Sequence, residues 1–322
     1  MANVVFAEDV TKSQFSKHVH KNIKITENSE RIKYINLNFQ LKDNDIIFCQ
    51  TEHIRFLFRV LKNSKVKNLV LITSQSDLEI DYSLVKKLPS CFKKWFCINA
   101  SIVHPKLVTI PLGIANDYEK NLTISELNGV TLDYFKKKKY LLYVNFNVNT
   151  NRNKRSHLYG LFQNKNNNIL LTKHDSKKSN YKENILNSNF VLCPEGNGID
   201  THRIWETLYL GSIPIVERRP AYDYIDALPV LTVDSFESIS NELLYKYLKD
   251  SNNNFNLEFL DFTYWKNMIT KEVENLEIKN KITINISKTC ITTYMLILKL
   301  RSILNKLRKY FLLYYWKIKK YL

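Results

Sequence analysis

Residues 189–217 hold most of the side chains in this chain whose types and spacing could do chemistry. The segment, NFVLCPEGNGIDTHRIWETLYLGSIPIVE, places glycines, acids, a histidine and an arginine between two short apolar runs. An arginine can donate a forked pair of hydrogen bonds to phosphate oxygens, and glycines let a ligand approach the backbone closely. A carboxylate can accept hydrogen bonds from the two hydroxyls of a ribose. Together these residue types predict a site for a nucleotide that carries a diphosphate.

The expected elements around this segment are a strand, a polar loop, a helix and a second strand. Asn189–Cys193 is an apolar run of strand length, Thr201–Leu210 has helical spacing, and Ser212–Val216 is apolar and β-branched. Such a unit is the crossover of a parallel sheet, where ligands bind at the carboxyl ends of the strands. The helix would direct its free N–H groups and the positive end of its dipole at a phosphate.

Two readings stay open for several polar residues of this segment. Arg203 and Glu206 share one helical face and could bind a diphosphate and a ribose, or could form only a surface ion pair. Asp200 could contact the ligand or only cap the helix. His202 could lie near the ligand or have a structural role. Cys193 is expected to pack in the core as a small hydrophobe.

The sequence CPEGNGIDTHRIWETLYLGSIPIV (193–216) resembles the carboxy-terminal motif of exostosin-like glycosyltransferases. More loosely, Glu206 with Gly211 and the residues Pro214, Ile215 and Val216 matches the donor-site element of GT-B enzymes, whose Glu holds the donor ribose. Arg203 matches the basic residue that exostosin-like sequences place just before it. The segments NLVLITSQSD (68–77), WFCINA with HPKLVTIPLGI (95–114) and YVNFNVNTNRNKR (143–155) are similar to bacterial polysaccharide-locus transferases.

This resemblance implies a GT-B architecture of two doubly wound Rossmann-like domains that face a cleft, with an acceptor domain at 1–139 and a donor domain at 140–277. It implies a glycosyltransferase of surface polysaccharide biosynthesis that moves a sugar from a nucleotide-sugar to a hydroxyl of a glycan or lipid-linked glycan. It favours a transfer that inverts the anomeric carbon and that needs no metal or other cofactor. The sequence DNDI (43–46) is discounted as a metal site because it opens an expected strand. The expected donor contacts are Glu195, Gly196, Asn197, Gly198, Asp200, His202, Arg203, Glu206, Arg152 and Arg155. For Arg152 and Arg155 the alternative is a solvated basic start of a helix.

Alternating strand-like and helix-like segments indicate an α/β fold with parallel sheets covered on both faces. In the first part, the expected strands are Tyr34–Phe39, Asp45–Cys49, Asn68–Thr73, Trp95–Asn99 and Leu107–Pro111. The helices expected between them are Glu52–Leu61 and Tyr82–Leu88. After a polar linker at about Asp117–Lys139, the second series comprises Tyr140–Phe146, a helix after Asn151, Asn168–Thr172, a helix near Tyr181–Leu186, the segment described above, Val230–Val233 and a helix at Ser235–Lys249.

An inverting transfer needs a base within hydrogen-bond reach of the acceptor hydroxyl. The expected strand ends of the first part offer four candidates, and the sequence does not choose among them. They are Glu52, His53, Asp77 and His104. Each could instead be a loop or capping residue.

Composition and cysteine usage favour a globular protein that stays in the cytoplasm. The 322 residues are 44% apolar and 25% charged, which is ordinary for folded domains. Five cysteines include no CxxC pair, so a reduced compartment is expected and a zinc site is not. The first residues, MANVVFAEDVTKSQF, lack the pattern of a signal peptide.

The net charge of +17 is concentrated near the end of the chain, where residues 278–322 contain eleven Lys or Arg and no Asp or Glu. From residue 289 onward, apolar residues at 296, 300, 303, 304, 307, 310, 311, 314, 318 and 321 share one helical face. This predicts a basic amphipathic helix over 289–322 that lies on an anionic membrane surface, at the inner face of the membrane. The run YFLLYYW (310–316) is too short to span a bilayer.

Other readings of the tail and of the whole chain remain open. The apolar face could pack on the protein or on a second subunit, so an oligomer is possible. Nucleic-acid binding is not expected, because no domain that recognises nucleic acid accompanies the lysines. The whole chain could also be a non-catalytic nucleotide- or glycan-binding protein on a transferase-like fold. A third reading is a membrane-recruited scaffold whose α/β body is an interaction module.

Overall fold

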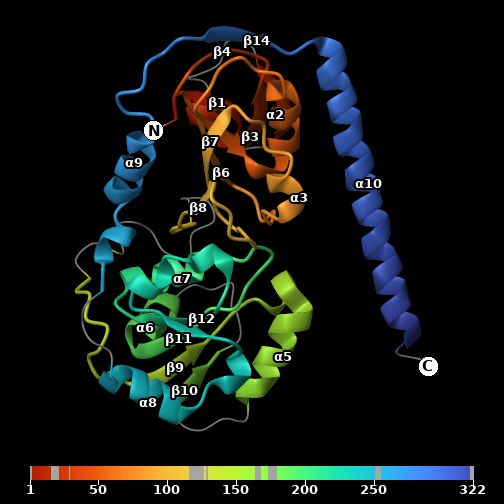
Figure 1. Ribbon diagram of the computed structural model, residues 1–322. Coiled ribbons are helices and arrows are strands. Elements are labelled where there is room, and N and C mark those ends of the chain that lie inside the picture. The colour runs from red at the N-terminus through yellow and green to blue at the C-terminus, as the bar shows by residue number, and fades with distance from the viewer. Residues whose placement is uncertain are drawn as a thin grey trace.

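The computed structural model describes residues 2–15, 22–28, 30–115, 127, 130–163, 168–172, 180–250 and 255–319. It contains two α/β units, each built on its own sheet, and a long helix, α10 (Lys288–Lys319), that runs beside both (Figure 1). The cores of the two units are separate clusters of buried apolar side chains.

The first unit is built on a seven-stranded mixed sheet, in the order β2-β3-β1-β5-β6-β7-β8. Its strands are β1 (Val4–Thr11), β2 (Asn22–Glu27), β3 (Arg31–Asn36), β5 (Ile46–Gln50), β6 (Leu69–Ser74), β7 (Phe92–Cys97) and β8 (Leu107–Thr109). Neighbours from β1 to β8 are parallel, whereas β3 is antiparallel to both β1 and β2. The prediction of an all-parallel sheet is therefore wrong for this edge, where a hairpin brings β3 back beside β1.

Short helices cover this sheet. They are α1 (Lys12–Phe15), α2 (Ile54–Leu61) and α3 (Tyr82–Val85). Helix α2 is short but strongly amphipathic, and Phe56, Leu57 and Leu61 on its inner face are almost fully buried. Together with the 3-10 turn at Thr51–His53 it occupies the expected helix Glu52–Leu61.

The second unit has a five-stranded parallel sheet in the order β10-β9-β11-β12-β13. Its strands are β9 (Tyr140–Val144), β10 (Ile169–Leu171), β11 (Ser188–Leu192), β12 (Ile213–Glu217) and β13 (Leu231–Val233). Its main helices are α5 (Arg152–Gln163), α6 (Tyr181–Leu186), α7 (His202–Tyr209) and α8 (Asn241–Asp250). The chain moves outward from β9 to β10 and then returns to β11 on the other side, so the topological switch point lies between β9 and β11. Ligands of doubly wound sheets bind at the carboxyl ends of the strands at such a point.

After the second unit the chain returns to the first (Figure 1). Helix α9 (Phe262–Lys271) packs Ile269 in a small core with Ile46 and Val70 of the first sheet. Strand β14 (Lys281–Asn285) then pairs with β4 (Asn38–Lys42). Residues 281–298 thus complete the first unit, although the sequence-based division assigns them to a separate tail.

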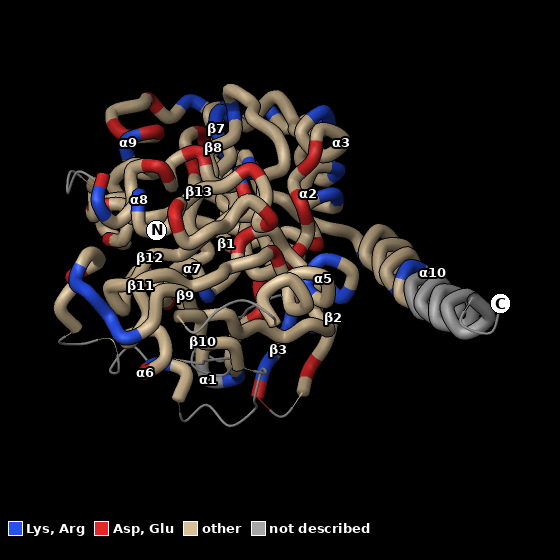
Figure 2. The backbone as a smooth tube through the Cα atoms, turned by 90° about the horizontal axis from the view of Figure 1, so that it is seen from below, with Lys and Arg blue, Asp and Glu red and all other residues tan. Residues whose placement is uncertain are grey.

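The start of α10 is anchored in the first unit. Ile291 and Tyr294 are 3% and 6% exposed, and the Tyr294 ring stacks on Phe56 with centroids 4.1 Å apart. After this anchor, the turns of α10 that Figure 2 draws in tan and blue lie outside the body of the molecule. No helix in the described ranges is both long and apolar enough to cross a bilayer.

The predicted linker at Asp117–Lys139 lies partly outside the described residues, at 117–126, 128 and 129. Its last part is not a solvated connection. Tyr134 is 5% exposed, and the Lys138 ammonium donates to the Gly211 carbonyl and the Ser212 hydroxyl, both at 2.7 Å. This segment therefore packs against the turn between α7 and β12.

Candidate functional site

A polar cleft of about 820 Å³ is lined by both units, a volume in the usual range for ligand sites. The first unit supplies most of its charge and the second unit supplies mainly the glycine loop between β11 and α7. From the first unit the charged lining residues are Glu8, Asp9, Arg31, Lys33, Glu52 and Asp77. The second unit contributes the lining residues Gly196, Asn197, Gly198, Asp200, Thr201 and His202.

Two of the candidate bases lie in this cleft. Glu52 follows β5 with a half-exposed side chain, and its carboxylate is 3.9 Å from the Lys33 ammonium. Asp77 follows β6 on an exposed loop that lines the same space. Either carboxylate could accept a proton from a hydroxyl bound there.

The structure does not bring the two histidine candidates into the cleft. His53 is 3% exposed, and its Nδ1 lies 2.8 Å from the Tyr294 hydroxyl on the side of α10. Burial, with a contribution from Lys33, lowers the pKa of His53 to about 4. His104 lies in the turn before β8, where its Nδ1 accepts a hydrogen bond from the Lys106 N–H.

Sequence reasoning missed the acids of β1 in the cleft. Glu8 accepts a hydrogen bond from the Tyr34 hydroxyl at 3.1 Å, and Asp9 pairs with the Arg31 guanidinium at 2.8 Å. Both acids lie in the carboxyl-terminal half of β1, just beyond its pairing with β5, where the chain order of the first sheet reverses. The apolar run VVFA directly before them was the available signal for this strand.

The loop after β11 is held by a buried arginine. Arg155 is 7% exposed and donates to the carbonyls of Pro194, Glu195 and Asn147 and to the Thr150 hydroxyl, at 2.6–2.9 Å. Burial, with repulsion from Arg203, lowers the pKa of Arg155 to about 10. Arg155 therefore positions the glycine loop and is not the solvated start of a helix. That description fits Arg152, which is exposed.

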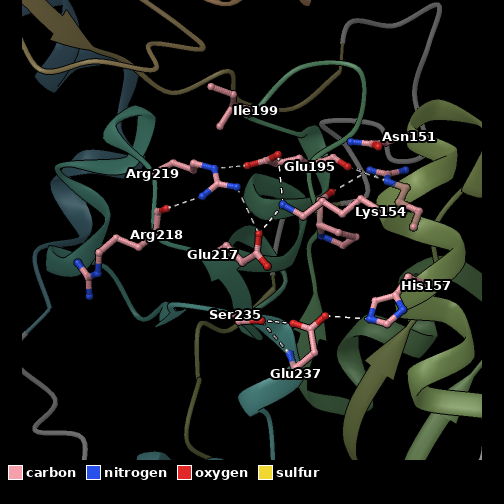
Figure 3. A network of polar contacts seen from close by, with 12 residues as sticks. Asn151, Lys154, His157, Glu195, Ile199, Glu217, Arg218, Arg219, Ser235 and Glu237 are labelled. Carbon is pink, nitrogen blue, oxygen red and sulfur yellow. Dashed lines mark hydrogen bonds and ion pairs between the residues drawn. The ribbon is translucent and has the colours of Figure 1, made fainter.

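Glu195 belongs to a network of two carboxylates and two cations (Figure 3). Its carboxylate pairs with Arg219 at 2.5 Å and with Lys154 at 3.3 Å. Both cations also contact Glu217 at the end of β12. The network ties the loop after β11 to α5 and to the segment after β12. Because its carboxylate is shared by two cations, Glu195 shapes the loop and is poorly placed to bind a diphosphate.

The two glycines of the loop are needed for close packing. Neither has a positive φ. A Cβ on Gly198 would lie 2.9 Å from Nδ2 of Asn99 in the first unit, and one on Gly196 would lie 3.2 Å from the Arg155 guanidinium. Asn99 in turn accepts a hydrogen bond from the Asp200 N–H at 2.8 Å. The missing side chain at Gly198 therefore lets the two units approach each other.

Asp200 joins the two units and does not cap α7. The N-cap position belongs to Thr201, which makes no side-chain capping bond. The Asp200 carboxylate accepts hydrogen bonds from the Leu112 N–H at 2.8 Å and from the Trp205 indole at 2.9 Å. His202 makes a similar tie, since its Nδ1 lies 2.7 Å from the Gly113 carbonyl.

Asp200 predicts a pH dependence of stability. Burial raises the pKa of its carboxyl from 3.8 to about 7, so this group stabilises the fold most at low pH, and that contribution is lost as pH rises towards 7. Between these values the loss is up to about 1.4 kcal/mol per pH unit. We expect the Tm of the wild type to fall between pH 5 and pH 7 more steeply than that of Asp200→Asn, measured by calorimetry in matched buffers. Equal slopes would contradict this assignment.

A buried polar cluster lies at the switch point of the second sheet. The Arg203 guanidinium is 5.1 Å from the centre of the Tyr181 ring and 3.4 Å from the Asn145 side-chain oxygen, just after β9. Glu206 is 1% exposed, and its Oε2 accepts a hydrogen bond from the Tyr181 hydroxyl at 2.6 Å. The alternative of a surface ion pair between Arg203 and Glu206 is therefore wrong.

Several polar atoms at this cluster lack a hydrogen-bond partner. Among the described residues, Oε1 of Glu206, one terminal nitrogen of Arg203 and the Thr201 hydroxyl are buried without a hydrogen-bond partner. Buried polar groups are almost always paired in folded proteins. An unpaired acceptor and two unpaired donors, all at the N-cap or in the first turns of α7, are what a hydroxylated, anionic ligand would satisfy. Thr201 lines the cleft, whereas Arg203 and Glu206, further along α7, are not among the lining residues described for it.

Residues 135–272 match the family model of the RXYLT1 C-terminal domain. The matched segment is less than half of the chain, but it contains the whole five-stranded sheet and the helices from α5 to α9. It therefore includes the glycine loop and the Arg203–Glu206 cluster, and it indicates a glycosyltransferase-like unit of the exostosin-related kind. No curated protein matches the chain.

The described part of the chain contains no group of three or more His, Cys, Asp or Glu side chains that could hold a metal ion. Asp43 of the DNDI sequence has a structural role, because its carboxylate accepts hydrogen bonds from the N–H groups of Lys67, Lys279 and Asn280. Cys193 is buried as expected, and burial raises the pKa of its thiol to about 12.

Proposed function

We propose that this protein is a glycosyltransferase of GT-B architecture that moves a sugar from a nucleotide-sugar to a hydroxyl of a glycan or lipid-linked glycan in surface polysaccharide biosynthesis. The observation that carries the proposal is the Arg203–Tyr181–Glu206 cluster. Its unpaired polar atoms lie at the switch point of a sheet within the glycosyltransferase-like segment. In this proposal Glu206 accepts hydrogen bonds from the donor ribose and Arg203 contacts the diphosphate.

The proposed reaction is a direct displacement with inversion. An acceptor hydroxyl bound against the first unit attacks the anomeric carbon while the bond from that carbon to the diphosphate breaks. Glu52 or Asp77, both in the cleft, takes the proton of the hydroxyl. The N-terminus of α7 and Arg203 stabilise the charge of the departing nucleoside diphosphate, and we propose that no metal is required.

A thermal-shift screen of the full chain against nucleotides and nucleotide-sugars tests the donor site. A ligand at one hundred times its Kd should stabilise the folded protein by about 2.7 kcal/mol. No stabilisation by any member of the panel would remove the donor-site proposal. A nucleotide that binds without donor hydrolysis or transfer to any acceptor would favour the non-catalytic alternative. Unchanged activity in cells after Glu206→Ala would favour the scaffold alternative.

We further propose that α10 attaches the protein to the inner, anionic face of a membrane. Leu296, Leu300, Ile303, Leu304 and Leu307 are 45–63% exposed along one helical face. The anchored residues Ile291 and Tyr294 lie on the opposite face at 100° per residue. The excess of Lys and Arg around this stripe complements anionic lipid.

Liposome flotation of the full chain tests this attachment. Leu300→Asp with Leu304→Asp is expected to abolish flotation with vesicles that contain phosphatidylserine, because it places charge in the apolar stripe. Thr292→Asp with Ser302→Asp is the control, since it adds the same charge at exposed positions outside the stripe. Equal flotation of both variants would refute the attachment. A dimer lost in the first variant alone would assign the stripe to a second copy.

A further inference from the structure

A second cavity, of about 530 Å³, lies between the first sheet and α9 and is mainly apolar. We call it the apolar groove. Phe48, Ile72 and Ile110 of the first unit form one wall. Trp205, Phe259 and Trp265, from the second unit and the returning chain, form the other. Among the residues that the structure describes, Glu8 is the only charged one in its lining.

The apolar groove adjoins the polar cleft. Glu8, Phe48 and Leu112 line both cavities. Leu112 is also the residue whose N–H donates to Asp200, so the junction lies where the two units are tied together. A molecule with its polar end in the cleft can therefore extend an apolar part into the groove.

The chemistry of the walls identifies which substrate would do so. A nucleotide-sugar carries phosphates and hydroxyls along its whole length, whereas the groove offers aromatic and aliphatic surface and one carboxylate. Phe262, at the rim, is 68% exposed. Exposed apolar surface that borders a polar site is typical of a ligand-binding groove.

We propose that the apolar groove binds an alkyl chain of the acceptor, with the acceptor hydroxyl held in the cleft near Glu8. The inference rests on the proposed function and narrows its acceptor to an amphipathic molecule, a sugar carried on a lipid. The groove and the exposed stripe of α10 are separate surfaces, because α9 and α10 lie on opposite sides of the first unit (Figure 1).

Hexyl, octyl and decyl maltoside, used below their micelle concentrations with the full chain, are the probes for calorimetric titration. Affinity is expected to rise about fourfold for each added methylene until the groove is filled. Phe262→Asp should weaken decyl maltoside binding at least about tenfold, since it charges the rim. Leu300→Asp with Leu304→Asp should leave it unchanged, which separates the groove from α10.

Tyr82→Asp is a closely matched control. Tyr82 is 67% exposed and opens α3 directly after the capping residue Asp81, as Phe262 opens α9 directly after Asp261. Equal loss of binding in both variants, or affinity independent of chain length, would overturn the proposal. So would concentration-dependent dimerisation that Phe262→Asp abolishes.

The nucleotide screen separates this inference from the proposed function. If alkyl maltosides bind as expected and no nucleotide does, the groove is an apolar binding site but its role as an acceptor site is overturned. If nucleotides bind and maltosides do not, the donor site stands and the lipid-linked acceptor is overturned.

Discussion

Glu206→Gln is expected to weaken binding of the best nucleotide ligand by about tenfold to one-hundredfold. The reason is the buried Oε1 of Glu206, which has no partner among the described residues and would accept hydrogen bonds from a ribose. Hydrogen bonds to a charged group contribute about 1.5–3 kcal/mol, and about 1.4 kcal/mol corresponds to a factor of ten in affinity. Glutamine keeps the shape of the side chain and can still accept from Tyr181, so the fold should be retained. Calorimetric titration of both proteins measures the difference.

Tyr181→Phe is the matched control for this substitution. It removes the hydrogen bond to Oε2 but leaves the carboxylate charge in place. We expect it to lower the Tm while changing the nucleotide Kd much less than Glu206→Gln does. If Glu206→Gln binds the nucleotide as tightly as the wild type, Glu206 is only a buried structural acid and the ribose contact is refuted.

Arg155→Ala is expected to lower the free energy of unfolding by about 3 kcal/mol. The substitution removes four hydrogen bonds and leaves three carbonyls of buried or half-buried loops without their donor. Arg152→Ala, on the exposed side of the same helix start, should change the free energy of unfolding by no more than about 0.5 kcal/mol. Urea unfolding monitored by circular dichroism gives both values.

The same pair of variants separates two roles predicted for these arginines. If Arg152 contacts the donor diphosphate, Arg152→Ala will raise the nucleotide Kd at an unchanged Tm, and the loss will shrink as salt is added. Arg155→Ala should raise Kd through a disordered glycine loop, together with its loss of stability. An Arg155→Ala protein of wild-type stability would refute the conclusion that Arg155 holds the glycine loop in position.

The second sheet was predictable because its strands are continuous apolar runs separated by polar turns. β9, β10, β11, β12 and β13 all lie within a few residues of their expected positions. The first sheet was less predictable from the sequence. In strand β1 a short apolar run is interrupted by the adjacent acids Glu8 and Asp9, which line the cleft. The expected strand Tyr34–Phe39 is divided between β3 and β4.

The candidate site was predictable in composition but not in three-dimensional detail. Its residue types predict a nucleotide site, which stays a prediction, and the structure places Arg203 and Glu206 at the switch point of the second sheet. Local sequence could not show that Gly198 packs against Asn99, because those residues are 99 positions apart and belong to different units. Nor could it show that Glu195 is neutralised by Arg219, which depends on the pairing of β11 with β12.

The pairing of β14 with β4 has a consequence for how the protein is made. On the ribosome, the second unit is complete once the turn Leu257–Leu260 has emerged, whereas the first still lacks α9, β14 and the buried Ile291 and Tyr294. The amino-terminal unit is therefore the last to finish, the reverse of the usual order of synthesis. Until then β4 presents an unpaired edge that could pair with another nascent chain. Folding yield should thus depend on prompt release of the carboxyl-terminal residues, even though they lie far from the cleft.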